Sequence, residues 1–361
     1  MSGPILIMAG GTGGHVFPAL AVAQALRADA REVVWLGTRR GLEARIVPAA
    51  GFPVEWVTVS GLRGKGLRTW LSAPVRLLVA LWQSLAVIRR RRPAAVLGMG
   101  GFVTGPGGVA AWLTRKPLVI HEQNAIAGLS NRLLARLARE VLEAFPHSFP
   151  AGLHTHCVGN PVRADMFTVP SPDERFAERE GRARLLVLGG SLGAQALNEL
   201  VPAALARLPE VARPEVWHQT GERTLATAQS AYAQAGVSVK LVPFIEDMAS
   251  AYAWADLVLC RAGAITIAEL AAVGVGAILV PFPHAVDDHQ THNAAWLVRA
   301  GAAELHQQDA IDAAILADRL QVLLADRAAL LEMARRARAT ARPDATSELK
   351  RACLVAAGAA S

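Results

Sequence analysis

Cysteine is scarce in this sequence: the 361 residues contain three, Cys157, Cys260 and Cys353. They lie far apart and show neither the paired spacing of a zinc site nor that of a disulfide framework. This pattern is typical of a protein from a reducing compartment. Charged residues are also few, at 19% against 52% hydrophobic residues, which excludes a disordered chain and indicates a globular one. The short N-terminal apolar run passes straight into a glycine-rich turn, unlike a signal peptide.

The sequence also lacks the common nucleotide-binding signatures. No P-loop pattern occurs, and the first glycine-rich turn, Gly10–His15, has His15 or Val16 where the dinucleotide fingerprint G-x-G-x-x-G needs its last glycine. The second predicted strand, 33–37, is followed by Arg39 and Arg40 rather than by an acid that holds a ribose hydroxyl. This disfavours a nicotinamide cofactor, although the two arginines leave a 2′-phosphate, and hence NADP, open.

What the sequence does contain is an alternation of short apolar strands and helical segments, which predicts an α/β fold with parallel sheets. The predicted strands are 5–9, 33–37, 54–59, 95–98, 118–120, 185–188, 216–219, 239–242, 256–260 and 277–280, with a helix at 42–50. Pro18 and the apolar spacing after it predict a helix with proline in its first turn. The length suits two domains. A turn-like stretch at 158–163 places their boundary at residue 160, and we expect two similar domains facing each other across a cleft.

Charge is distributed unevenly. Residues 1–160 hold 18 Lys and Arg against 7 Asp and Glu, a net charge of +11, whereas residues 161–361 hold 19 against 23, a net of −4. The basic half predicts an anionic partner such as a nucleic acid or a membrane surface. Neither an RNA-binding aromatic motif nor a helix-turn-helix occurs, so we expect no nucleic acid and favour a membrane.

Residues 62–92 form a segment that is both apolar and basic. A helical stripe along it consists of Leu71, Val75, Leu78, Trp82 and Leu85. Pro74 and Arg76 interrupt an apolar run that would need about 20 residues to span a bilayer. The stretch Arg89–Arg92 ends it. We therefore predict a helix that lies on a membrane, with Leu and Trp in the acyl boundary and Arg at anionic headgroups, joined by Trp112. The alternative is a core helix with a solvated basic end.

Glycine-rich turns follow three of the predicted strands and open helices, at Gly10–His15, Gly100–Gly108 and Gly189–Ala194. Such turns present backbone N–H groups and a positive helix end, an arrangement that binds anions or carbonyl groups. A fourth turn, Arg261–Glu269, suits a diphosphate. Its Glu269 lies one turn into the helix, where a carboxylate can accept two sugar hydroxyls or merely complement the helix dipole.

Two further polar stretches follow strands. His121–Asn124 comes at the carboxyl end of 118–120, the edge at which open α/β sheets bind ligands, although Asn124 is equally suited to cap a helix. His289 and His292, near two aspartates, allow a metal site. A polar helix start that touches a ligand is the favoured interpretation, because spacing fixes no third ligand.

Together these stretches, with Asn160–Arg163, resemble the MurG family, the bacterial N-acetylglucosaminyltransferases of peptidoglycan synthesis. The matching pieces occur in the expected order over most of the chain. The resemblance implies a GT-B fold of two Rossmann-like domains. Residues 1–160 would bind the acceptor and face the membrane, residues 161–340 would bind UDP-GlcNAc, and residues 341–361 would pack back on the first domain.

The reaction implied by the resemblance moves GlcNAc from UDP-GlcNAc to the MurNAc 4-hydroxyl of lipid I, giving lipid II with inversion. The implied location is the cytoplasmic face of the inner membrane, as a peripheral protein, with anionic inner-leaflet lipids and other cell-wall synthesis proteins as partners. No cofactor and no metal are expected. The alternatives are another GT-B nucleotide-sugar transferase acting on a lipid glycoside, a sugar epimerase of this fold, and a non-catalytic membrane-attached scaffold.

The resemblance also implies residue roles. The residues that would contact UDP-GlcNAc are Thr12, Gly13, Gly14, Asn124, Arg163, Ser191, Ile245, Ala264, Ile265, Thr266, Ile267, Ala268, Glu269 and Gln290. Those on the acceptor or membrane side are Gly101, Thr104, Leu78, Trp82 and Arg89. His15 is the candidate general base, or else it positions the acceptor. Ala262 stands where the family usually has Ser, and His289-Gln290 replaces a Gln pair found in some members.

Overall fold

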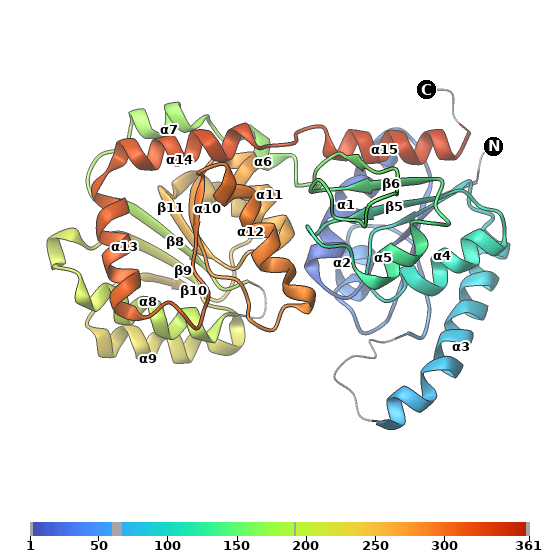
Figure 1. Cartoon of the computed structure of the whole chain (residues 1–361), viewed down its shortest axis with the longest axis horizontal. Coiled ribbons are helices and arrows are strands. Elements are labelled where there is room, and N and C mark those ends of the chain that lie inside the picture. Colours follow the sequence, from blue (N-terminus) through green and yellow to red (C-terminus); the bar gives the residue numbers. More distant parts are fainter. Residues whose placement is uncertain (1–2, 60–66, 191–192, 359–361) are drawn as a thin grey trace. The chain divides into compact units, whose positions relative to one another are not determined.

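The computed structural model describes residues 3–59, 67–190 and 193–358, with side chains omitted for 67–72. The chain forms two compact units, the first made of residues 1–163 and 342–361 and the second of residues 164–341. The predicted limits were 160 and 340, and the final segment had been expected to join the first unit. Each unit is an α/β layer structure (Figure 1).

The first unit is built on a seven-stranded parallel sheet of order β3-β2-β1-β4-β5-β6-β7. Its strands are β1 (Ile5–Met8), β2 (Val33–Gly37), β3 (Val54–Trp56), β4 (Ala95–Gly98), β5 (Leu118–Glu122), β6 (Glu140–Glu143) and β7 (His156–Cys157). Its helices are α1 (Gly13–Ala28), α2 (Glu43–Ala49), α3 (Leu67–Arg91), α4 (Thr104–Leu113), α5 (Leu129–Leu134) and α15 (Ala345–Ala356). In the register, Ile5 lies between Val33 and Ala95.

The second unit is built on a six-stranded parallel sheet of order β10-β9-β8-β11-β12-β13. Its strands are β8 (Arg184–Leu188), β9 (Glu215–Gln219), β10 (Lys240–Val242), β11 (Leu257–Cys260), β12 (Gly276–Leu279) and β13 (Ala303–Leu305). Its helices are α6 (Asp165–Thr168), α7 (Pro172–Ala177), α8 (Gln195–Arg207), α9 (Leu225–Ala235), α10 (Met248–Trp254), α11 (Ala264–Val273), α12 (His289–Arg299), α13 (Ala313–Ala325) and α14 (Arg327–Ala339). Counted within each unit, the first six strands of the two sheets follow the same order, 3-2-1-4-5-6.

Both faces of the first sheet carry a hydrophobic core, which explains why its central strands are continuously apolar. One core joins the sheet to α1, α2 and α15, and the other joins it to α3, α4 and α5. Leu349 and Cys353 of α15 are fully buried in the first of these cores, and Lys350 pairs with Asp29 at 2.7 Å. The C-terminal helix is therefore an integral part of the first unit.

Helix α1 begins earlier than predicted. It starts at Gly13, so Pro18 lies in its second turn and the last two glycines of the turn, Gly13 and Gly14, belong to the helix. The prediction was wrong because glycine is a poor helix former, and a glycine run therefore reads as loop. Strand β5 in turn extends to Glu122, so His121 and Glu122 are strand residues rather than residues that follow a strand.

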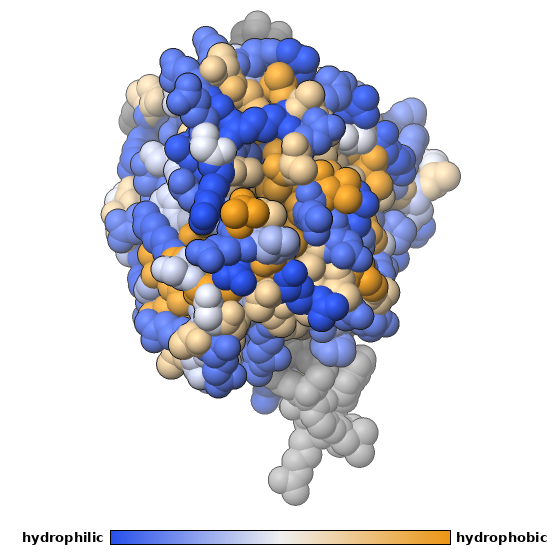
Figure 2. All heavy atoms as spheres, turned by 90° about the vertical axis from the view of Figure 1, so that its left-hand side faces the viewer, coloured by the Kyte–Doolittle hydropathy of each residue, from blue (hydrophilic) through white to orange (hydrophobic). Residues whose placement is uncertain are grey.

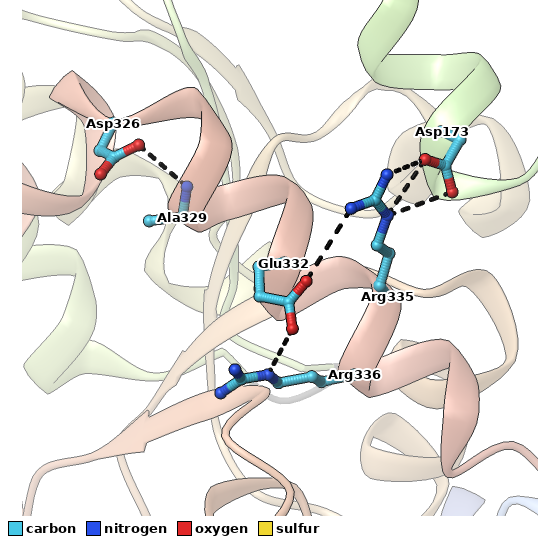
Figure 3. Close-up of polar contacts among 6 residues, drawn as sticks. All are labelled: Asp173, Asp326, Ala329, Glu332, Arg335 and Arg336. Atoms are coloured by element: carbon cyan, nitrogen blue, oxygen red, sulfur yellow. Dashed lines mark hydrogen bonds and ion pairs between the residues drawn. The ribbon is translucent and has the colours of Figure 1, made fainter.

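On the face drawn in Figure 2, hydrophilic residues predominate and hydrophobic ones lie between them. Figure 3 shows an exposed ion-pair network in which Arg335 of α14 donates to Asp173 of α7 while Glu332 accepts from Arg336 at 2.8 Å. Side chains this exposed contribute little to stability because water screens them.

Candidate active site

The first glycine turn is held by a buried carboxylate. Glu43, at the start of α2, accepts hydrogen bonds from Gly11 N at 2.9 Å and from the backbone and hydroxyl of Thr38 at 2.9 and 2.8 Å. Thr12 precedes α1, and Gly13 and Gly14 form its first turn. The prediction had missed Glu43. The only feature of the sequence that points to Glu43 is its place as an acidic residue just after a second loop, Gly37–Gly41.

The second glycine turn packs directly on the first. Gly100 and Gly101 have φ angles of 90° and 83°, which favour glycine. A Cβ at position 101 would overlap the carbonyl oxygen of Gly10, and one at position 100 would lie 2.6 Å from His15 Nδ1. Thr104 is fully buried and its hydroxyl donates to Gly100 O at 2.8 Å. Its side chain therefore holds the turn, and its expected place on the acceptor side stays a prediction.

A chain of polar side chains connects these turns to the end of β5. His15 Nδ1 lies 2.9 Å from Gln123 Oε1, and Gln123 Nε2 lies 3.0 Å from His121 Nδ1. His121 Nε2 lies 2.9 Å from Gly159 O. Burial lowers the pKa of His121 to about 4, so this imidazole is neutral at pH 7. His15 itself is half-buried.

Asn124 does not cap a helix. Its backbone N and its side-chain Nδ2 donate to Glu122 Oε1 at 2.9 and 3.2 Å, and the next helix, α5, begins at Leu129. Glu122 Oε2 also accepts from Asn131 Nδ2 at 2.9 Å. The alternative reading of Asn124 as a cap is thus wrong, and its expected contact with the donor stays a prediction.

The third glycine turn follows β8, and Ser191 in it lies outside the described residues. Gln219 holds the start of the turn: its side-chain Nε2 donates to Gly190 O at 2.9 Å, and its backbone oxygen accepts from Gly189 N at 2.9 Å. Gly190 has a φ of 75°.

Helix α11 starts directly after Gly263 at the end of β11. The first N–H groups of a helix have no carbonyl partner within the helix, so this end can bind an anion. Ile267 and Ala264 are buried, which leaves only backbone contacts to them. Ile265, Thr266, Ala268 and Glu269 are half-exposed. Ile245 is likewise buried, so the expected donor contact there would be through its backbone.

Glu269 is oriented by a residue that the sequence analysis missed. The hydroxyl of Tyr252, on α10, donates to Glu269 Oε2 at 3.0 Å. The opposite end of α11 is capped by two arginines: Arg175 donates to Val273 O at 2.8 Å and to Gly274 O, and Arg338 donates to Ala272 O. Cations at a helix C-terminus stabilise the helix, so the two arginines fix this end of α11.

Gln290 lies in the first turn of α12, and its Oε1 accepts from Phe282 N at 2.9 Å. His289 Nδ1 donates to Val286 O at 2.7 Å. Over the described ranges, no three His, Cys, Asp or Glu side chains group in a way that could hold a metal ion, so the metal-site alternative at His289 and His292 finds no support.

Arg163 is exposed at the end of the first unit.

Helix α3 carries an exposed apolar surface. Trp82, Leu78 and Val75 are 70%, 65% and 63% exposed. Leu85 instead packs against the core, and the side chain of Leu71 lies outside the described part. Trp112, on the neighbouring α4, is also exposed.

The basic end of α3 is partly neutralised. Arg89, Arg90, Arg91 and Arg92 are all exposed, but Glu55 pairs with Arg90, and with Arg91 at 2.7 Å. Among the helices that the structure describes, none combines the length and apolar content needed to cross a bilayer.

Comparison with known proteins identifies the family. The glycosyltransferase family 28 N-terminal domain matches residues 5–143 and the family 28 C-terminal domain matches residues 184–349. Proteins named UDP-N-acetylglucosamine--N-acetylmuramyl-(pentapeptide) pyrophosphoryl-undecaprenol N-acetylglucosamine transferase are similar throughout. The one from Alkalilimnicola ehrlichii is 64% identical over 98% of this chain and 99% of its own, and the one from Marinobacter nauticus is 56% identical over 98% and 97%.

Solved structures agree with these relatives. The crystal structure of Acinetobacter baumannii MurG is 40% identical, covers 98% of this chain and 99% of its own, and has a TM-score of 0.85. The calicheamicin glycosyltransferase CalG4 shares the fold at 17% identity, with a TM-score of 0.67 over 98% of this chain and 99% of its own. The expected GT-B fold of two Rossmann-like domains is confirmed. The chain belongs to glycosyltransferase family 28 and, within it, to the MurG family.

Proposed function

We propose that this chain moves N-acetylglucosamine from UDP-GlcNAc to lipid I, forming lipid II for peptidoglycan synthesis. The observation that carries the proposal is the 64% identity, over 98% of the chain, to a transferase whose name states this donor and this undecaprenol-linked acceptor. The chain is thus a UDP-GlcNAc-dependent N-acetylglucosaminyltransferase. In the reaction the acceptor 4-hydroxyl attacks the anomeric carbon as the bond to UDP breaks, and a single displacement inverts that carbon.

The donor diphosphate is assigned to the second unit, at the N-terminus of α11. The backbone N–H groups at Gly263–Ile265 suit a diphosphate, and both the helix dipole and these groups stabilise the charge that develops on leaving UDP. Charge supports the choice of unit. In the first unit the buried carboxylate of Glu43 already occupies Gly11 N–H, whereas the corresponding turn after β8 is held by the neutral Gln219. Ser191 and Arg163 are further proposed contacts.

The sugar is assigned to Glu269 and Gln290. A carboxylate accepts hydrogen bonds from hydroxyls, and Tyr252 fixes the orientation of Glu269. The Oε1 atom of Gln290 is bonded to Phe282 N, so the amide reaches a ligand through its Nε2 donor. Glu269 would thus accept a hydrogen bond from the sugar, and Gln290 would donate one to it.

The general base is assigned to His15. Histidine is the side chain most often used for proton transfer, and such a base contributes about 10²–10⁴-fold to the rate. The ring is half-buried at the start of α1, and its Nδ1 is held by Gln123. The proton of the acceptor 4-hydroxyl would pass to this imidazole.

Membrane docking is assigned to α3, because the acceptor carries a lipid chain and the helix has an exposed apolar surface. Leu78, Trp82 and Val75 would enter the acyl boundary of an anionic bilayer, with Arg89 at the headgroups. Glu55 reduces the positive charge of the Arg89–Arg92 cluster but does not cancel it. Binding by such a surface weakens as salt rises.

The test is to offer the purified protein several UDP-sugars with lipid I and to measure the release of UDP and the formation of lipid II. UDP-GlcNAc should be turned over, and UDP-sugars that differ in one hydroxyl should be poor donors. A reaction mixture without lipid I controls for hydrolysis of the donor. Binding of UDP-GlcNAc without turnover on lipid I would contradict the proposal and indicate a scaffold.

A further inference from the structure

In the chain of polar side chains from His121 through Gln123 to His15, each hydrogen bond has a defined donor and a defined acceptor. We infer that Gln123 and His121 are positioning residues that hold His15 in the tautomer with its proton on Nδ1, which leaves the lone pair on Nε2. The inference rests on the proposed function for the use of that lone pair, as the base that takes the acceptor's proton. The tautomer itself follows from three hydrogen bonds.

The first link fixes the tautomer of His121. A backbone carbonyl oxygen can only accept, so the 2.9 Å contact of His121 Nε2 with Gly159 O requires the hydrogen on Nε2. The ring is fully buried, and burial disfavours its charged form. A neutral imidazole has one N–H, so Nδ1 of His121 can only accept.

The second link fixes the orientation of the Gln123 amide. Its Nε2 lies 3.0 Å from His121 Nδ1 and 3.2 Å from His121 O, and both of these atoms are acceptors. A flipped amide would place Oε1 against two acceptors, with no hydrogen between them. Gln123 is itself buried, and its backbone oxygen accepts from Asn160 Nδ2 at 2.9 Å. The amide therefore presents its oxygen to His15.

The third link fixes His15. Gln123 Oε1 can only accept, so the 2.9 Å contact with His15 Nδ1 requires the hydrogen on Nδ1. The logic is that of a third group that orients the base of a catalytic triad, with a neutral amide in place of the usual carboxylate. Gly100 leaves room for the ring in this position, because a Cβ at residue 100 would lie only 2.6 Å from His15 Nδ1.

The direct test is spectroscopic. In protein labelled with ¹⁵N-histidine, long-range ¹H–¹⁵N spectra distinguish a protonated from an unprotonated ring nitrogen, and the His15 signals are assigned by their loss in His15→Ala. We expect Nδ1 protonated and Nε2 unprotonated near neutral pH. In Gln123→Leu, which has similar volume but no acceptor, the fixed Nδ1–H signal should be lost. Wild-type protein with the hydrogen on Nε2 of His15 would overturn the inference.

A second variant separates positioning from packing. In Gln123→Glu one carboxyl oxygen can still accept from His15 Nδ1. The other takes the place of Nε2 and faces two acceptors of His121, so it needs a hydrogen, and burial favours this protonated, neutral form of the carboxyl. We expect Gln123→Leu to lower kcat roughly 10²-fold with KM for UDP-GlcNAc unchanged, and Gln123→Glu to restore the Nδ1–H signal and most of kcat. If Gln123→Glu is as impaired as Gln123→Leu or more so, a structural role of Gln123 explains the data and the inference fails.

A matched control is available in the second unit. His218, on β9, is also fully buried, and burial lowers its pKa to about 3. His218→Phe removes a comparable neutral histidine and should change neither the His15 signals nor kcat; a change in either would contradict a specific relay. The tautomer assignment and the proposed function can fail separately. If the wild-type protein shows the expected His15 signals but does not turn over UDP-GlcNAc on lipid I, the proposed function is wrong and the tautomer assignment stands.

Discussion

The two units follow the same strand order, but the helices that connect the third strand of each sheet to the fourth differ greatly. In the first unit this connection is α3, with 25 residues and an exposed apolar surface. In the second it is α10, with seven residues, of which Ala249, Ala251 and Tyr252 are buried. The comparison teaches that the shared scaffold only sets where a crossover runs. The length and surface of the crossover decide whether it presents an exposed apolar surface, as α3 does, or orients a neighbouring side chain, as Tyr252 of α10 does for Glu269.

The glycine turns after the first strand of each sheet differ in a second way. A carboxylate, Glu43, holds the turn of the first unit, and an amide, Gln219, holds that of the second. The two turns thus differ in the charge of the side chain that holds them, and only the first has a carboxylate that would repel an anion. The following predictions test this division of roles, beginning with the largest expected effect.

His15→Ala should lower kcat by about 10²–10⁴-fold, because it removes the proposed base. Binding of UDP-GlcNAc, assigned to the other unit, should be unchanged when measured by calorimetry. The two measurements together ask whether chemistry and donor binding are separated between the units. A loss of less than about tenfold in kcat would make positioning of the acceptor the better account of His15.

Trp82→Ser combined with Leu78→Ser should weaken binding to anionic vesicles by about 10²-fold, since each large apolar side chain contributes about 1.5–3 kcal/mol when buried. Turnover of a soluble, short-chain acceptor should survive. The matched control replaces two exposed side chains of the second unit, Val211 and Val322, with Ser. Equal losses in both double variants, or none in either, would count against α3 as the docking helix.

Acid should destabilise both units through their buried histidines. Burial lowers the pKa of His121 to about 4 and that of His218 to about 3, against 6.5 for an exposed histidine. Below pH 6.5 these two histidines therefore bind protons in the unfolded chain but not in the folded chain. The free energy of unfolding falls as the pH falls. For His121 the loss between pH 6.5 and 4 is roughly 3 kcal/mol.

Urea unfolding at pH 7 and pH 5 measures the part of this loss that occurs above pH 5, roughly 2 kcal/mol for His121. The same experiment on His218→Phe should give a smaller difference between the two pH values, because one of the two buried groups is gone. Identical pH dependence in the variant and the wild type would show that His218 does not contribute as its burial indicates.

Glu269→Ala should reduce discrimination between UDP-GlcNAc and UDP-sugars with altered hydroxyls by about ten- to hundredfold, since hydrogen bonds to a charged group contribute about 1.5–3 kcal/mol. Tyr252→Phe, which removes only the orienting hydroxyl, should shift discrimination in the same direction by less. Competition assays with paired UDP-sugars measure both effects. Unchanged donor preference in Glu269→Ala would remove this residue from the site.

Most strands of the two sheets could be predicted from the sequence because the central ones are buried on both faces and form short apolar runs, such as Ile5–Met8. Strands β6, β7 and β13 were not predicted, because β6 and β13 contain glutamates and β7 has only two residues. The start of α1 could not be predicted either, because the helix begins with two glycines, Gly13 and Gly14, which are poor helix formers. The exposed stripe on α3 was predicted from helical periodicity, yet Leu85 faces the core. Periodicity defines a direction around a helix, but the width of the buried face depends on the neighbouring helix.

Much of the candidate site depends on contacts between residues far apart in sequence. Gln123 meets His15 across 108 positions, and Glu43 meets Gly11 across 32. Each of these side chains has an ordinary local environment in the sequence, so no spacing rule selects it. The pairing arises only when parallel strands bring their carboxyl ends to one edge of a sheet.

The return of the chain to the first unit at α15 has a consequence for synthesis on the ribosome. Domains generally fold in the order in which they are made, but here the unit that is begun first cannot close its core until residues 164–341 have been translated. The hydrophobic face that Leu349, Ala352 and Cys353 cover stays open during that interval. The nascent first unit is then a candidate client for chaperones, and a chain that ends before α15 should lose the His15 unit while the second unit stays folded.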